Sequence, residues 1–373
     1  MPPARVLAGL LVAIAAAACG GRYGRSTTPG DEHGKMGIEQ AALPFSIIDR
    51  TGHTTDMAAF WSRLSHARAV CVGEDHPNPH HHWVQLMVVR ELFKRVQKSD
   101  HLALGLEMIQ RPFQGVVDDY EAHRIDAPTL RSRAGWEERW GYSWEYYGPT
   151  IDAAIGAGAH VLALNAPKEL TKKVVRHGLE SLSPDEKAQI PQLELHDPIH
   201  RAWFDATMES MGGSAAHSSK TPEATPDALT VKPDGKDAKD AKDAKDAKDK
   251  APEPEPPSNA APHGHGGPPP EMPSADRVYT VQVIWDETMA DGAAKWLAAN
   301  PRGHLVLLAG NGHCHDSAIV ARIKRRGVAD VVSLRAVIDD GEGSVSEVLA
   351  KPVNDFVLVL QLPKQAKTTA SAR

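Results

Sequence analysis

The chain has no excess of positive charge: 42 Lys and Arg stand against 48 Asp and Glu in 373 residues, which gives a formal net charge of −6. Proteins that bind nucleic acid need basic side chains to neutralise phosphates, so nucleic acid is not an expected partner. The sequence also lacks a Gly-x-Ser-x-Gly elbow, a Walker loop, a His-Glu-x-x-His pair, a Cys-x-x-Cys pair and a glycine-rich dinucleotide fingerprint. These absences exclude the familiar nucleophile and nucleotide sites.

The apolar run at residues 6–18 is shorter than the roughly 20 residues that a membrane-spanning helix needs. Arg5 precedes it and small residues follow, so residues 1–18 are typical of a secretory signal peptide. Ala-Ala-Ala-Cys at 16–19 resembles the lipobox of bacterial lipoproteins, with Ala16 where Leu is more usual. This predicts lipidation of Cys19 and anchoring in a lipid bilayer. Because Gly20 rather than Asp follows, the resemblance favours an outer-membrane lipoprotein facing the periplasm; the alternative is an ordinary cleaved signal.

Cysteine is scarce, with three residues in the chain. If Cys19 carries lipid, Cys71 and Cys314 remain, and an oxidising compartment would allow them to pair. Cys71 lies inside an apolar run, which is typical of a small buried hydrophobic side chain. We therefore expect Cys71 to stay unpaired.

Two segments and the C-terminal tail lack the apolar residues that a packed domain needs. Residues 19–44 are polar and rich in glycine and predict a flexible tether, while residues 212–274 combine a Lys-Asp-Ala repeat with a Pro-rich stretch. Such compositions cannot bury enough surface to offset the loss of chain entropy, so we expect a disordered insertion at 212–274 and a disordered tail at 363–373. One domain in two pieces, 45–211 and 275–362, remains.

Six apolar runs within this domain predict buried strands, at 68–73, 102–107, 160–165, 304–310, 330–337 and 356–362. Helical patterns lie between them, at 81–96, 129–147, 150–157, 168–177, 184–211, 277–299 and 316–326. Apolar strands that alternate with helices indicate an α/β fold with a mostly parallel sheet flanked by helices. The insertion would interrupt a helical hairpin.

Polar residues follow four of the predicted strands. They are Glu74 and His76, then Glu107, Asn165, and Asn311 with His313. Because ligands bind outside the carboxyl ends of parallel strands, we expect these side chains to converge on one crevice. Each alone could simply cap a helix or fix a turn, as such residues often do.

Two kinds of chemistry suit these residues. Glu74 and His76 could act as general base and acid, or could hold a metal ion such as Zn together with His313. An aromatic stretch offers a wall for a flat ligand and phenol oxygens for its iron; it comprises Trp136, Trp140, Tyr142, Trp144, Tyr146 and Tyr147. Rings at helical spacing are also typical of a core.

Six stretches, in this order, resemble the motifs of the ChaN-type lipoproteins of the Tiki superfamily: "VGEDHPNPHHHWVQ", "LALGLEMIQRPFQ", "WGYSWEYYGPTIDAA", "LALNAPKEL", "VIWDETMA" and "LLAGNGHCH". The resemblance covers nearly the whole domain. It implies an α/β core, haem bound at a homodimer interface, and a role in iron or haem acquisition with haem transport components. Pro77 stands where Asp is frequent in the family, and the long insertion is atypical.

The residues that match the family motifs are Glu74, His76, Asn78, His81, His82, Glu107, Gln114, Asn165, Asn311 and His313. The resemblance does not fix the iron ligand, so the haem-pocket candidates are His81, His82, Tyr142, Tyr146, Tyr147, Asn165 and Asn311. His80 falls at a variable position, and we expect its imidazole to be solvated.

The wider superfamily also resembles metal-dependent proteases and esterase-like hydrolases. This gives an alternative, a hydrolase that uses Glu74, His76, Glu107 and His313 with a divalent metal. A structural lipoprotein whose polar cluster only closes the sheet is a third possibility.

Overall fold

The computed structural model describes residues 37–96, 101–210 and 273–363. The predicted signal peptide, Cys19, the first part of the tether, the tail from residue 364 and all but the last two residues of the insertion lie outside the described residues. No helix in the described part of the chain is long and apolar enough to cross a membrane.

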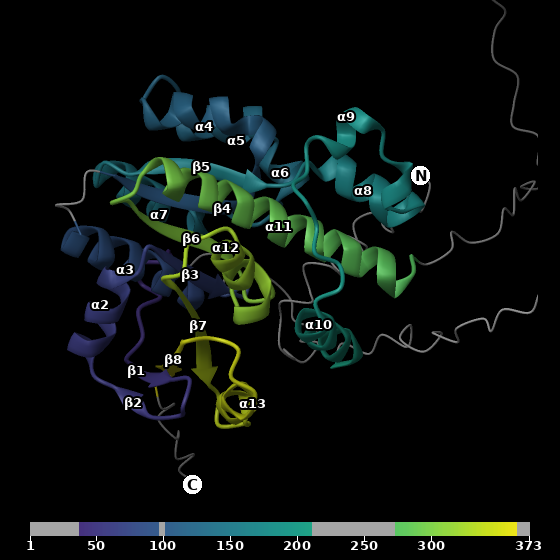
Figure 1. Ribbon diagram of the computed structural model, residues 1–373. Helices are drawn as coiled ribbons and strands as arrows, with labels where there is room; N and C mark the ends of the chain where they lie inside the picture. The colour runs from purple at the N-terminus through teal and green to yellow at the C-terminus, as the bar shows by residue number, and fades with distance from the viewer. Residues whose placement is uncertain (1–36, 97–100, 211–272, 364–373) are drawn as a thin grey trace, which may run out of the picture. The chain divides into compact units, whose positions relative to one another are not determined.

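Eight strands form one sheet in the order β2-β1-β8-β7-β3-β6-β4-β5 (Figure 1). Their bounds are β1 Phe45–Asp49, β2 Thr54–Thr55, β3 Ala69–Glu74, β4 Leu102–Gln110, β5 His160–Asn165, β6 His304–Gly310, β7 Val331–Asp339 and β8 Phe356–Gln361. The five pairings among β3 to β8 are parallel, and β1 joins β8 and β2 in antiparallel fashion. The predicted α/β fold with a mostly parallel sheet is therefore confirmed, and the six predicted strands match β3 to β8 closely.

Alternating residues of the central strands face two separate cores. On β3, Val70 and Val72 pack against α2 (Met57–His66), α3 (Pro79–Val96) and α7 (Gly148–Gly156). Ala69 and Cys71 face the other side, toward α11 (Ala275–Ala299) and α12 (Ala321–Arg325). This alternation follows from the two-residue period of a strand, and it decides which face each strand-end side chain serves.

The spacing predicted one helix over the aromatic stretch, but the structure divides this stretch into shorter pieces. It forms α5 (Ala127–Ala134), α6 (Trp136–Arg139) and a short 3-10 turn, η3 (Trp144–Tyr146). Gly135 and Gly141, with φ of +63° and +86°, separate these pieces. Because glycine adopts positive φ without a steric cost, the two glycines end each helix and fold the rings back on one another.

The pattern at 184–211 also divides into two helices, α9 (Pro184–Lys187) and α10 (Pro198–Ser210). Pro191 and Pro198 prevent a continuous helix because proline lacks the backbone N–H and restricts the residue before it. At the other end of the domain, the expected helix at 316–326 begins with a π-type turn, η5 (Asp316–Val320), before α12. Phe204 of α10 packs edge-on against Tyr279 of α11, with ring centroids 5.2 Å apart.

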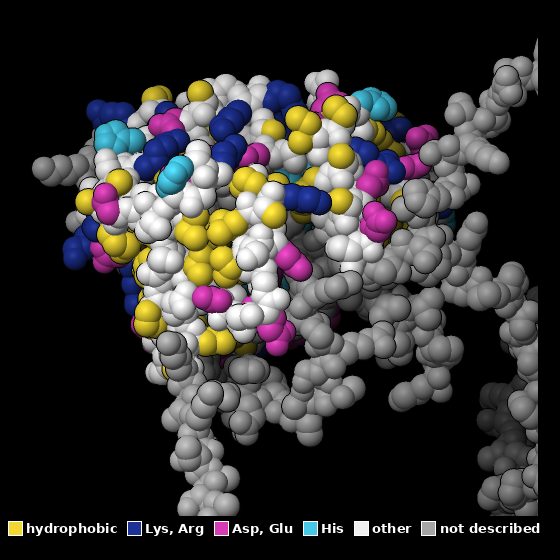
Figure 2. All heavy atoms as spheres, turned by 90° about the horizontal axis from the view of Figure 1, so that it is seen from below, with side chains coloured by type: hydrophobic (Ala, Val, Ile, Leu, Met, Phe, Trp, Pro, Cys, Tyr) yellow, Lys and Arg dark blue, Asp and Glu magenta, His cyan; other side chains and the backbone are white. Residues whose placement is uncertain are grey.

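The remaining helices complete the layers. They are η2 (Arg111–Phe113), α4 (Gln114–Glu121), α8 (Lys168–His177), η4 (Leu179–Ser181) and α13 (Ser344–Ala350). The edge formed by β1, β2, β8 and α13 lies at the bottom of Figure 1. Figure 2 shows the molecule from that side, where hydrophobic side chains gather in the middle and charged side chains surround them.

The predicted tether ends earlier than expected. Ile38 and Leu43 are buried and belong to the core on the α3 side, and Ala41 between them is buried as well. His80 is half-buried, and its Nδ1 donates a 2.7 Å hydrogen bond to the carbonyl oxygen of Ala41. The expectation of a solvated imidazole was therefore wrong: His80 fastens this N-terminal segment to α3.

Cys71 and Cys314 form a disulfide, contrary to the prediction of an unpaired Cys71. β3 and β6 are neighbouring parallel strands, and the chain turns back directly after Gly310. This turn brings the Cα of Cys314 to 5.3 Å from that of Cys71, within the usual range for a disulfide. The two pieces of the domain, which precede and follow the insertion, are thus covalently joined.

Candidate functional site

The polar side chains at the strand ends divide between the two faces of the sheet. Glu74 shares the face of Val72, whereas Glu107 points to the face on which α11 packs, where its Oε2 accepts a 2.7 Å hydrogen bond from the Gly310 amide. The strands thus place one carboxylate on each side of the same sheet edge. Each carboxylate is paired with a different histidine.

Glu74 and His76 form the first pair. Glu74 is fully buried, and its Oε1 accepts a 2.5 Å hydrogen bond from Nδ1 of His76, which is 3% exposed. Burial opposes the charged form of both groups, but the attraction within the pair prevails: the pKa of Glu74 is lowered, and the pKa of His76 is raised to about 9. Glu107 and Asp75 add to the rise in the His76 pKa. The pair is therefore a buried imidazolium and carboxylate at neutral pH.

Aromatic rings surround the first pair. The His76 ring lies 4.7 Å from that of Trp140 and 4.8 Å from that of Tyr142. Tyr147 is fully buried, and its hydroxyl donates to Glu74 Oε1 at 3.4 Å. Burial, followed by the Glu74 charge, holds the pKa of Tyr147 well above its usual value, so its phenol stays protonated. Among the predicted tyrosines, Tyr142 alone is half-exposed, since Tyr146 and Tyr147 are buried.

His82 and Tyr146 are packed inside this aromatic region. Their rings are stacked, with centroids 4.8 Å apart and an interplanar angle of 13°. Nε2 of His82 donates to the carbonyl oxygen of His76 at 3.0 Å, and its Nδ1 lies 3.2 Å from Oε1 of Gln85. Burial lowers the pKa of His82. Both ring nitrogens of His82 are thus engaged, and its Nε2 positions the turn that carries His76.

His81 and Asn311 meet at Asp75. Nδ1 of His81 accepts a 3.1 Å hydrogen bond from the Asp75 amide, and Nδ2 of Asn311 donates to the Asp75 carboxylate at 2.9 Å. Burial lowers the pKa of His81 to about 4, so this imidazole is neutral. Within the described residues, the buried Nε2 atoms of His76 and His81 have no hydrogen-bond partner. Asn78 lies directly before α3 and caps this helix, since its side chain accepts hydrogen bonds from the His80 and His81 amides.

Glu107 and His313 form the second pair, with a third member that the sequence analysis missed. Nε2 of His313 lies 3.4 Å from Glu107, and its Nδ1 donates to Asp286 Oδ1 at 2.7 Å. Burial lowers the pKa of His313, but the two carboxylates raise it by more. The imidazole thus bridges β4 and α11 as a cation between two anions.

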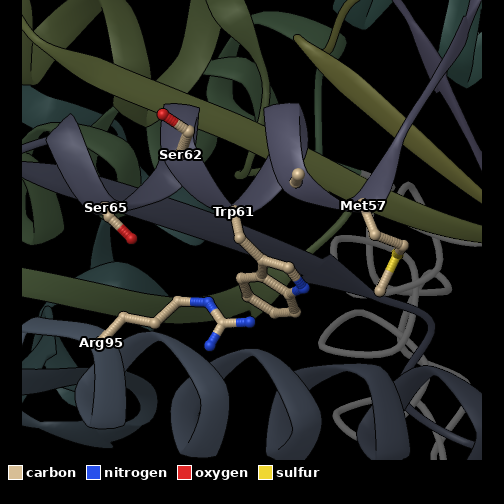
Figure 3. A pocket seen from close by; sticks show the side chains of 6 residues that line it. Met57, Trp61, Ser62, Ser65 and Arg95 are labelled. Atoms are coloured by element: carbon tan, nitrogen blue, oxygen red, sulfur yellow. The ribbon is translucent and has the colours of Figure 1, made fainter.

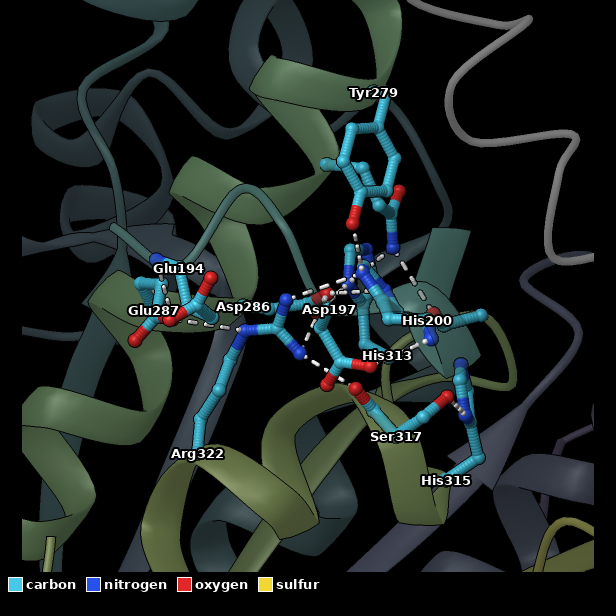
Figure 4. Close-up of polar contacts among 12 residues, drawn as sticks. Glu194, Asp197, His200, Tyr279, Asp286, Glu287, His313, His315, Ser317 and Arg322 are labelled. Carbon is cyan, nitrogen blue, oxygen red and sulfur yellow. Dashed lines mark hydrogen bonds and ion pairs between the residues drawn. The ribbon is translucent and has the colours of Figure 1, made fainter. Parts of the chain in front are cut away.

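Asp286 also belongs to a buried network on the α11 side (Figure 4). Its Oδ2 lies 3.2 Å from Nε2 of His200 on α10, while Arg322 on α12 donates to His200 Nδ1 at 3.1 Å. Arg322 also lies 3.3 Å from the buried carboxylate of Glu287. Burial would raise the pKa of Asp286, but His313 and Arg322 lower it. The motif "VIWDETMA" contains both acids, and their position on one helix was the signal that could have identified them.

Asn165 and Gln114 hold the last strand in place. Nδ2 of Asn165 donates to the Glu107 carbonyl oxygen at 2.9 Å. Gln114 accepts from the Ala163 amide at 2.7 Å and donates to the Val161 carbonyl oxygen at 2.8 Å. These bonds continue the β5 ladder through side chains, and they support the strand that flanks Glu107.

The predicted metal site is not supported. The described residues contain no group of three or more His, Cys, Asp or Glu side chains placed to hold a metal ion. Glu74 and His76 contact each other, while His313 contacts Glu107 and Asp286 on the opposite face. Since these side chains are engaged with separate partners, a metal-dependent hydrolase is not favoured.

A surface pocket of about 460 Å³ lies elsewhere, between α2 and the end of α3 (Figure 3). It is lined by Met57, Ala58, Trp61, Ser62, Ser65 and Arg95. The Arg95 guanidinium lies 4.9 Å from the centroid of the Trp61 ring. This pocket is at the opposite end of α3 from His81 and His82, and it contains none of the predicted site residues.

Comparison with known proteins is consistent with this arrangement. A family model described as "Haem-binding uptake, Tiki superfamily, ChaN" matches residues 60–323. A solved structure described as "Cofacial heme binding to ChaN of Campylobacter jejuni" is similar, with a TM-score of 0.56 and 16% identity over 85% of this chain and 96% of that chain. At this identity the structural likeness shows the fold. No curated protein matches the chain.

Proposed function

Because the chain belongs to the ChaN family of the Tiki superfamily, described as haem-binding uptake proteins, we propose that it binds haem beside the Glu74–His76 pair. The match over residues 60–323 carries the proposal, since it spans both faces of the site. The aromatic surroundings of His76 suit a flat, apolar ligand that buries most of its surface.

Tyr142 is the proposed iron ligand. Its ring is half-exposed and lies 4.8 Å from that of His76, whereas Tyr146 and Tyr147 are buried. Tyrosine oxygen is an established haem ligand, and bound haem would supply a ferric iron that prefers the phenolate. The His76 cation stabilises negative charge nearby, and the Trp140 ring, 5.5 Å from that of Tyr142, supplies an apolar wall.

Glu74 acts through His76 in this proposal. It holds Nδ1 of the imidazole, leaving the buried Nε2 without a partner among the described residues. This nitrogen can donate a hydrogen bond toward the haem pocket. His82 supports the same turn through the His76 carbonyl oxygen. Glu74 and His82 are thus positioning residues for His76.

We place the protein in the periplasm as an outer-membrane lipoprotein anchored through Cys19, where it would take part in haem or iron acquisition. The Cys71–Cys314 disulfide supports an oxidising compartment, because disulfides are rare in the reducing cytosol. The similar structure of the Campylobacter jejuni protein is described as showing cofacial haem binding. By analogy we propose that this chain presents its haem in a homodimer and passes it to transport components.

Haem titration of the protein without its signal peptide tests the proposal. We expect a saturable Soret band and clearly weaker binding for Tyr142→Phe and His76→Gln. Tyr120→Phe is the matched control, because Tyr120 is also half-exposed and its hydroxyl donates to Asp152 instead. Absence of saturable binding would refute haem binding. Equal binding by Tyr142→Phe and the control would refute only the assignment of the iron ligand.

A further inference from the structure

A continuous row of oxidisable rings runs from the proposed haem site to the surface. Tyr142 lies 5.5 Å from Trp140, Trp140 lies 5.8 Å from Tyr147, and Tyr147 lies 5.5 Å from Trp136, measured between ring centroids. Trp136 lies 4.9 Å from Trp144. These contacts place five Trp and Tyr rings in sequence.

The row ends at Tyr120 on α4, whose ring centroid is 6.4 Å from that of Trp144. Tyr120 is half-exposed, and its hydroxyl donates a 2.6 Å hydrogen bond to the carboxylate of Asp152 on α7. Oxidation of a phenol by one electron releases its proton, and here a carboxylate is already in place to accept it. Tyr120 is thus the member of the row best suited to hold a radical at the surface.

The composition of the row distinguishes it from ordinary core packing. Tryptophan and tyrosine lose an electron far more readily than phenylalanine does. The chain contains six Phe, eight Trp and six Tyr, yet all six rings of the row are Trp or Tyr. An apolar core needs only size and shape, for which Phe serves equally well.

We propose that, when haem is bound and hydrogen peroxide is the oxidant, this row carries the oxidising equivalents to Tyr120, which then couples to Tyr120 of a second molecule. The proposal rests on haem binding at Tyr142. Reduction of one peroxide to two waters breaks the O–O bond and consumes two electrons and two protons. Both electrons pass through the row of the molecule that reacts with the peroxide: its Tyr120 is oxidised first, recovers an electron and a proton from Tyr120 of the second molecule, and is then oxidised again. Asp152 accepts the phenol proton at each oxidation of this Tyr120. Two Tyr120 radicals form a carbon–carbon bond between their rings, so two tyrosines and one peroxide yield dityrosine and two waters.

This pathway protects the proposed haem site. Oxidising equivalents that remain near the iron would damage Tyr142 and Trp140, which lie closest to it in the proposal. Transfer along the row moves the damage to Tyr120, which lies at the end of the row beside Asp152.

The test treats the full mature chain, loaded with haemin, with hydrogen peroxide and measures dityrosine fluorescence, cross-linked dimers and the cross-linked peptide. The wild type is expected to give dityrosine at Tyr120. Tyr120→Phe and Trp144→Phe should both lose the signal while keeping the Soret band. Tyr279→Phe is the control and should retain it, because Tyr279 packs against His200 and Phe204 outside the row.

The outcomes separate this proposal from the proposed function. If the wild type gave no saturable Soret band when haemin was added, before any peroxide, both haem binding and the relay would be refuted. A saturated Soret band without dityrosine, or with dityrosine at Tyr142, would refute the relay alone. An undiminished signal in Trp144→Phe would also refute it, because Tyr120 would then be oxidised directly from solution.

Discussion

Replacement of His76 by Gln should remove a pH-dependent part of the stability. The pKa of His76 is raised from 6.5 to about 9 in the folded protein, chiefly because Glu74 outweighs the effect of burial. A raised pKa means that the folded state binds the proton more tightly than the unfolded state does. The resulting stabilisation is complete below about pH 6.5 and is lost as the pH rises through about 9.

The pKa difference sets the size of the effect. A shift from 6.5 to about 9 corresponds to about 3 kcal/mol of unfolding free energy. Urea denaturation from about pH 6 to about pH 10 should show this decline in the wild type. In His76→Gln the decline should be reduced by most of that amount. His53→Gln replaces an exposed histidine and leaves the Glu74–His76 pair intact, so it should retain the decline.

Parallel curves for the wild type and His76→Gln across this range would refute the buried ion pair. A wild-type stability that rose with pH through this range, relative to the variant, would have the wrong sign and would indicate that burial determines the state of His76.

Two further predictions concern the opposite face. Replacing both Cys71 and Cys314 by Ser should lower the free energy of unfolding by about 2–4 kcal/mol, as measured by urea denaturation, and reductant should then have no further effect. Asp286→Asn should cost about 3–5 kcal/mol, because it leaves buried cations without their partner, and should lower the pKa of His313 measured by NMR. Asp276→Asn, an exposed acid on the same helix, should cost less than about 1 kcal/mol. Equal losses for the two Asp variants would contradict the buried network.

The sheet could be predicted because its strands are continuous apolar runs. β5 and β6 match the predicted residues, since parallel strands covered on both faces leave little doubt about their extent. The short antiparallel strands β1 and β2 were not predicted, because brief edge strands give a weak hydrophobic pattern. The prediction of one helix at 129–147 was wrong for a local reason, because two glycines at positive φ interrupt it.

The sequence predicted which strand-end residues belong to the candidate site, but not which of them pair with one another. Polar residues after four strands identified Glu74, Glu107 and their histidines, because strand ends in parallel sheets meet at one edge. Which face of the sheet each of these side chains occupies depends on the exact residue at which its strand ends. An error of one residue in that position moves the side chain to the opposite face. Asp286 was missed because it reaches the edge from a helix that follows the insertion.

The disulfide makes the domain a single covalent body whatever happens to the chain between its two pieces. A backbone cut anywhere between residues 210 and 273 would leave fragments that remain linked through Cys71 and Cys314. β3 would stay beside β6, and each would keep its half of the site. The protein can therefore be cleaved in its insertion and still present Glu74, His76 and His313 at one sheet edge, as long as its surroundings are oxidising.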